Sequence, residues 1–202
     1  MNTAQRSTDV RQPPAAAIRG TAAGLFMMAF FTSLWAGIAY GGWHESGLRF
    51  IPVIFIIAVI YFVSQGIRIL GLAKNYPDVK SAEDRAEGKR MGKWFGIIFG
   101  AEGLFIFLAV NLLIHFGHPE LIIPAIALVV GLHFYPMGWM FRRTIDYYLA
   151  SWATAIAVLA IIFAMNRILS QPAVLAFTGL GMAAATTAYG IYMLSYAKKL
   201  GI

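Results

Sequence analysis

Six long apolar stretches constrain the fold of this chain more than any other feature. They lie near residues 20–40, 50–73, 94–116, 121–141, 147–167 and 172–196. Each is long enough to cross about 30 Å of hydrocarbon at about 1.5 Å per helical residue. The stretches lack the alternation of a membrane β-barrel, so helices are the spanning structure. The sequence therefore predicts an all-α polytopic membrane protein, with residues 20–202 forming one domain of six transmembrane helices.

Composition supports a lipid environment. Of the 202 residues, 59% are hydrophobic and 12% are charged, whereas soluble domains average about 45–50% and about 25%. A single core of this size could not bury that excess, so we expect the lipid bilayer to be the chain's main partner. The sequence has no cysteine, which excludes disulfides, thiolate metal sites and thiol catalysis.

The distribution of positive charge predicts the orientation. If six spans alternate, 14 of the 16 lysines and arginines fall on one side of the membrane, and only Arg49 and Arg167 fall on the other. The positive-inside rule makes the basic side cytoplasmic, so both termini are expected inside the cell, beneath the inner (plasma) membrane. This placement also explains the formal charge of +7 without a nucleic-acid partner, for which no motif is present.

Two polar segments accompany the spans. Residues 1–19 are expected to form a disordered cytoplasmic tail. The first span has a basic flank and small residues, as a signal peptide does, but its 20 apolar residues exceed the usual length of about 7–15. Residues 74–93 form the one sizeable soluble loop, in which 82–91 could form a short surface helix. This loop is either a solvated linker beside lipid headgroups or a docking site for a protein partner.

Glu102 and His133 are the two ionisable residues placed deepest in the predicted spans. Glu102 follows Lys93 by nine residues, and His133 precedes Arg142 by nine residues on the next, antiparallel span. At about 1.5 Å per residue, both lie about 13 Å from the cytoplasmic end. Consecutive helices joined by a short loop are usually neighbours. We therefore expect the carboxyl and the imidazole to meet.

Other polar residues are expected to complete this intramembrane polar pocket. Gln65 precedes Lys74 by nine residues, and Arg68 lies one turn nearer the cytoplasm. Pro136 leaves a backbone carbonyl without its helical partner beside His133. Glycines flank Glu102 and are expected to permit close helix approach, at positions 96, 100 and 103. The Glu102–His133 pair either fixes helix register or relays a proton and holds a polar solute.

A second group of polar side chains is expected at the outer surface. It comprises His44, His115, His118 and Glu120. Two imidazoles and a carboxylate could bind Zn²⁺ or Cu²⁺. The Gly and Pro residues between these positions indicate a loop, and interfacial placement of the side chains is the simpler explanation. No motif for a cofactor is present, and we expect none.

The last span is rich in small residues. Gly179 and Ala183 form a small-xxx-small pair, which permits close packing of two helices. The partner helix could belong to the same chain or to a second copy. The sequence thus leaves a homodimer through the Gly179/Ala183 face as an alternative to intramolecular packing.

The stretch GLHFYPMGWMFRRTIDYYL (131–149) resembles part of uncharacterised small bacterial inner-membrane proteins. Those proteins carry a His-Phe-x-Pro element late in a mid-chain span, which corresponds here to residues 133–136. The resemblance implies a multispan bacterial membrane protein and carries no functional residue over to this chain.

Three classes of function fit these observations. The first is a small transporter or channel-like protein that uses the Glu102–His133 pocket. The second is a non-catalytic scaffold or accessory subunit that meets partners through loop 74–93 and the Gly/Ala face. The third is an intramembrane enzyme, which is disfavoured because no Ser–His pair, paired aspartates or metal motif occurs at a common depth.

Overall fold

The computed structural model describes residues 13–43, 50–78, 82–199 and 201–202. Within these ranges the chain forms six long helices and no strand. The helices are α1 (Ala15–Trp43), α2 (Ile54–Leu72), α3 (Ala82–His115), α4 (Ile122–Phe141), α5 (Thr144–Met165) and α6 (Gln171–Lys199). Short 3₁₀ turns precede α2 and α4 and follow α2, at Ile51–Val53, Pro119–Leu121 and Ala73–Asn75. The expected all-α architecture is confirmed, and all six helices are long and apolar enough to cross a membrane.

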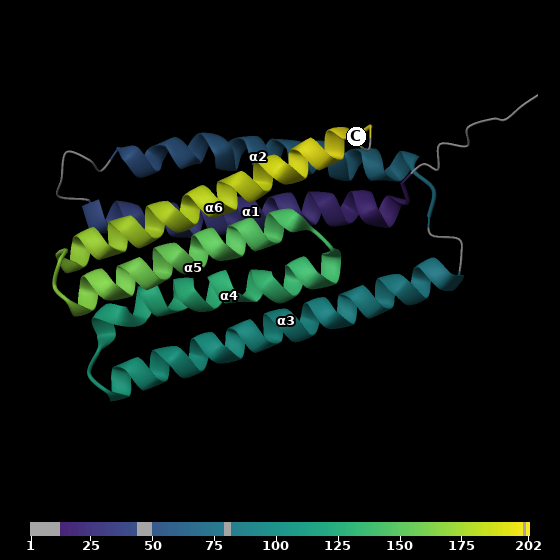
Figure 1. The fold of residues 1–202 in the computed structure, drawn as a ribbon. Coiled ribbons are helices and arrows are strands. Elements are labelled where there is room, and N and C mark those ends of the chain that lie inside the picture. The colour runs from purple at the N-terminus through teal and green to yellow at the C-terminus, as the bar shows by residue number, and fades with distance from the viewer. Residues whose placement is uncertain (1–12, 44–49, 79–81, 200) are drawn as a thin grey trace, which may run out of the picture.

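The helices run alternately up and down, so that one end of the bundle collects most of the basic residues (Figure 1). At that end the start of α1 contacts the segment after α2. The Ala15 backbone N–H donates to the Pro77 carbonyl at 2.9 Å, and Arg19 lies 3.5 Å from Asp78. Helix α1 therefore begins inside the expected tail, of which residues 1–12 lie outside the described part of the chain.

Helices α1 and α6 form the centre of the bundle because small residues let their backbones approach closely. A Cβ atom built on Gly179 would lie 2.5 Å from the Ala39 nitrogen and 2.6 Å from the Trp35 carbonyl oxygen. Ala183 is fully buried. Gly179 thus packs against α1 of the same chain, which is the intramolecular alternative that the sequence left open.

Helix α3 lies at the edge of the bundle and packs mainly on α4 (Figure 1). Only 6% of its most apolar stretch is buried, against 61% for α6. Its glycines do not mediate close approach, since a Cβ at Gly96, Gly100 or Gly103 would meet nothing within 4 Å. That expectation was wrong, because these positions face away from α4.

The start of α3 also corrects the predicted loop 74–93. Residues 82–93 are not a separate surface helix but the first turns of α3 itself, and nearly all of them are exposed. No proline interrupts this segment, so the helix extends from the apolar span into the charged region. Residues 79–81 lie outside the described ranges.

Candidate functional site

The structure brings Glu102 of α3 and His133 of α4 together. Glu102 Oε1 lies 3.5 Å from His133 Nδ1, and each side chain is only 9% exposed. A distance of 3.5 Å exceeds the usual range of about 2.7–3.2 Å for a strong hydrogen bond. The carboxyl therefore retains capacity to bind a proton or a second partner. The equal depth of the two residues, counted along an antiparallel hairpin, accounts for their meeting.

Aromatic side chains hold the imidazole in place. The His133 ring centroid lies 5.5 Å from that of Phe99 on α3 and 4.2 Å from that of Phe134 on α4. Phe134 in turn meets Tyr189 of α6 edge-on at 5.9 Å. These contacts restrict rotation of the ring and keep Nδ1 directed at Glu102.

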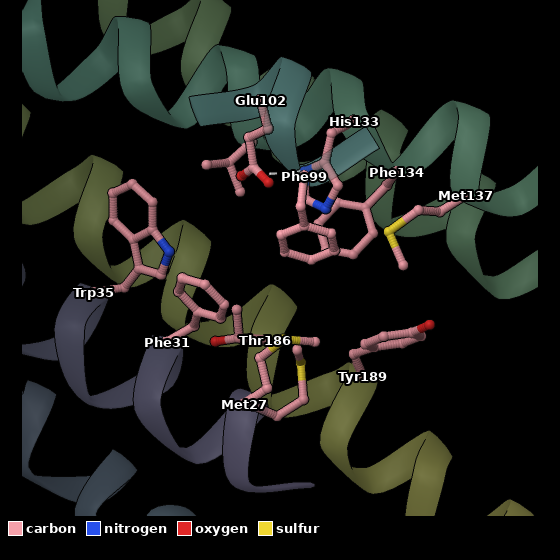
Figure 2. A pocket seen from close by; sticks show the side chains of 12 residues that line it. Met27, Phe31, Trp35, Phe99, Glu102, His133, Phe134, Met137, Thr186 and Tyr189 are labelled. Atoms are coloured by element: carbon pink, nitrogen blue, oxygen red, sulfur yellow. Dashed lines mark ion pairs between the residues drawn. The ribbon is translucent and has the colours of Figure 1, made fainter. Parts of the chain in front are cut away.

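An internal cavity of about 20 Å³ lies on one side of the pair (Figure 2). Side chains of α1 and α6 line it opposite Glu102 and His133, including Trp35, Thr186 and Tyr189. The Trp35 indole nitrogen is buried without a hydrogen-bond partner among the described residues. A volume of about 20 Å³ is enough for roughly one water molecule.

A larger groove of about 700 Å³ lies on the other side of the pair, between α3 and α4. Its walls are apolar apart from Glu102 and His133, which line both the groove and the internal cavity. Wall residues such as Phe105, Leu112 and Leu132 are about half exposed, so the groove opens to the outside of the bundle. The acid–imidazole pair thus separates an outward-facing groove from an interior cavity.

Gln65 and Arg68 do not belong to this pocket. Both lie on α2, where the Arg68 Nε donates a hydrogen bond of 2.9 Å to the Gln65 side chain at an exposed position. Helix α2 packs on α1 and α6, at the opposite edge of the bundle from α3 (Figure 1). Gln65 was predicted at the same depth as Glu102, but the two residues do not meet, because α1 and α6 lie between α2 at one edge of the bundle and α3 at the other.

The predicted outer metal site is not assembled in the part of the chain that the structure describes. His118 Nδ1 contacts Glu120 Oε1 at 3.0 Å, whereas the His115 ring packs edge-on against Phe116. No group of three metal-ligating side chains occurs among the described residues. His44 lies outside them.

A second polar cluster, which the sequence analysis missed, lies where α4 turns into α5. Asp146 is fully buried, and neither carboxylate oxygen has a hydrogen-bond partner among the described residues. The Tyr189 hydroxyl and Arg143 are the side-chain groups that act on its carboxyl, and Arg143 Nη1 donates to that hydroxyl at 3.4 Å. Because Tyr189 also lines the internal cavity, this cluster continues the polar lining toward the basic end of the bundle.

Sequence reasoning missed Asp146 because the residue was assigned to the connection after Arg143. That connection is very short: α4 ends at Phe141, and α5 begins at Thr144. Arg142 adopts the left-handed conformation, with φ of 52°, and reverses the chain within two residues. The first turn of α5 therefore lies inside the bundle, and Asp146 in that turn is buried.

Taken together, the fold and the site fit a multi-pass integral membrane protein with a buried acid–imidazole pair between two helices. The chain belongs to a family of unknown function, DUF7010, whose model matches residues 81–191, more than half of the sequence. The matched segment contains Glu102, His133 and Asp146. Searches of curated proteins and of solved structures find no match to this chain.

Proposed function

We propose that this protein is a small proton-coupled transporter of the bacterial inner membrane, in which Glu102 and His133 bind the transported proton. The observation that carries the proposal is the buried pair at 3.5 Å between the internal cavity and the outward-facing groove. Ionisable groups in membrane spans are costly, and their presence beside a water-sized cavity favours a functional role over a purely structural one.

A proton path needs more than one exchanging group. From Glu102 and His133, the lining of the internal cavity continues through Thr186 and Tyr189. The Tyr189 hydroxyl then accepts from Arg143, beside the buried Asp146. This order of polar groups supports proton movement between the pair and the basic end of the bundle.

The basic end is proposed to face the cytoplasm. Lysines and arginines follow α2 and α4, lie in the last turn of α6 and occur in the first turns of α1 and α3. These helix ends all lie at one end of the bundle (Figure 1). Under the positive-inside rule this end is cytoplasmic, which places both termini inside.

Labelling of single introduced cysteines tests this orientation. The native chain has no cysteine, so it contributes no labelling of its own. Glu87→Cys lies in the exposed first turns of α3, and Ser170→Cys lies at the opposite end before α6. In intact spheroplasts, a membrane-impermeant maleimide is expected to label Ser170→Cys and to label Glu87→Cys only after permeabilisation. The reverse pattern would overturn the proposed topology.

Proton flux in reconstituted vesicles tests the function. A potassium diffusion potential applied to vesicles with an entrapped pH dye is expected to drive proton uptake through the native protein. Glu102→Gln keeps the shape of the side chain but removes its titratable proton, and we expect the flux to fall at least about tenfold.

The matched control is Glu87→Gln, the same chemical change at an exposed position of the same helix. This variant is expected to retain native flux. Equal flux from the native protein, Glu102→Gln and His133→Ala, with normal reconstitution of all three, would reject the proton-site proposal.

A further inference from the structure

The groove between α3 and α4 has the dimensions and lining of a site for an amphiphilic ligand. Its volume of about 700 Å³ falls within the range of about 300–1,000 Å³ that is typical of small-molecule sites. Its walls are built from aliphatic and aromatic side chains, with Glu102 and His133 as the polar groups. Such a site favours a ligand with a large apolar body and one polar feature.

The charge of that polar feature follows from the residues around Glu102. No lysine or arginine is among the described residues that line either the groove or the internal cavity. Among the residues that line these two spaces, His133 is therefore the one group that could carry a positive charge beside Glu102, and only with its imidazole protonated. The two side chains are not closely hydrogen-bonded. In a low-dielectric setting an ionised carboxylate needs a compensating positive charge.

The route to the groove favours a ligand that partitions into lipid. The groove lies along the apolar portion of α3 and is open between half-exposed side chains. Its opening therefore faces hydrocarbon if the six helices span the membrane. Phe105 in the groove wall adds an aromatic face that can attract a cation.

We infer that the α3–α4 groove binds a lipophilic organic cation, whose positive charge pairs with the Glu102 carboxylate. This inference rests on the proposed function, since it names the substrate class of the same site. One carboxylate cannot hold a proton and be fully paired with a cation at the same time. Protonation of Glu102 therefore releases the cation, and arrival of the cation displaces the proton, so that the two species compete for the same carboxylate.

Binding of tetraphenylphosphonium to the purified full-length protein in detergent tests the inference. This cation has a bulky apolar body and no hydrogen-bonding group, so its affinity reports shape and charge alone. We expect saturable binding measured by equilibrium dialysis, and Glu102→Gln is expected to weaken it at least about tenfold. Tetraphenylborate, which has the same shape and opposite charge, is expected to show no saturable binding.

A second variant tests whether the ligand occupies the groove, independently of the charge on Glu102. Ala109→Phe places a ring in the groove without touching Glu102, and it is also expected to weaken binding of tetraphenylphosphonium. Ala86→Phe makes the same chemical change at an exposed position of α3 outside the groove and is expected to leave binding unchanged. If Glu102→Gln does not fold, the comparison of the two phenylalanine variants still decides the question.

Two outcomes would overturn the inference. The first is equal binding of the two ions, and the second is binding of tetraphenylphosphonium that is insensitive to both Glu102→Gln and Ala109→Phe. Absence of binding together with a proton flux that still depends on Glu102 would refute the lipophilic cation alone. Loss of both binding and flux in the native protein would refute the proposed function as well.

Discussion

Gly179→Ala is expected to destabilise the folded protein. The added Cβ would lie 2.5–2.6 Å from backbone atoms of Trp35 and Ala39 on α1. Backbone atoms cannot rotate away as a side chain can, so α1 and α6 must separate along their central contact. Overpacking of this kind costs about 1–3 kcal/mol and occasionally more. Thermal unfolding in detergent, followed by size-exclusion profile, is expected to shift to clearly lower temperature.

Gly100→Ala is the matched control for Gly179→Ala. Gly100 is also inside a long helix, but a Cβ there would meet nothing within 4 Å. Replacement of a helical glycine by alanine is worth about 1 kcal/mol in favour of the helix. We therefore expect the control to be neutral or slightly stabilising. Equal destabilisation by both variants would show that α1 and α6 do not pack as described.

Arg143→Met is expected to destabilise the protein strongly, and Asp146→Asn is expected to restore most of the loss. Arg143 is half-buried beside the fully buried Asp146. Its guanidinium is held over the Phe141 ring at 4.9 Å and by the Tyr189 hydroxyl. Without the guanidinium, the buried carboxyl has no nearby positive charge. Removing one partner of a buried ion pair costs about 3–5 kcal/mol. The loss here is expected to be smaller, because Arg143 acts on Asp146 through its charge, no direct ion pair between them is found among the described residues, and Arg143 is partly exposed.

A double-mutant cycle measures this coupling. The native protein, Arg143→Met, Asp146→Asn and the double variant are compared by thermal unfolding in one detergent. We expect Asp146→Asn alone to cost less than Arg143→Met alone, because an amide carries no charge to be compensated. Strict additivity of the two changes would show that Arg143 and Asp146 do not interact.

The helices were predictable because hydropathy determines which segments can cross hydrocarbon, and it does so one segment at a time. The start of α3 was not predictable by the same argument. Residues 82–93 are as charged as a solvated linker, and hydropathy cannot distinguish a linker from a helix that continues out of the membrane. The absence of proline was the signal available, although Gly88 and Gly92 in the same segment disfavour a helix.

The candidate site shows when the depth of a residue along its helix predicts which residues it contacts. Counting residues placed Glu102, His133 and Gln65 at one depth, but only the first two were also on helices joined by a short loop. Gln65 lies on α2, and the sequence predicted the long connection 74–93 between that span and the span of Glu102, so chain adjacency gave no information about its neighbours. Which face of α6 meets which helix likewise depends on packing of the whole bundle, as the burial of Gly179 against α1 illustrates.

The peripheral position of α3 has a thermodynamic consequence for any molecule that bridges the two walls of the groove. One wall belongs to α4, which is anchored by α5, and the other to α3, which has α4 as its main neighbour. The packing of α3 on α4 and the binding of a ligand in the groove are then linked equilibria. By reciprocity, a ligand strengthens attachment of this outermost helix by the same free energy that the attachment contributes to the ligand's affinity.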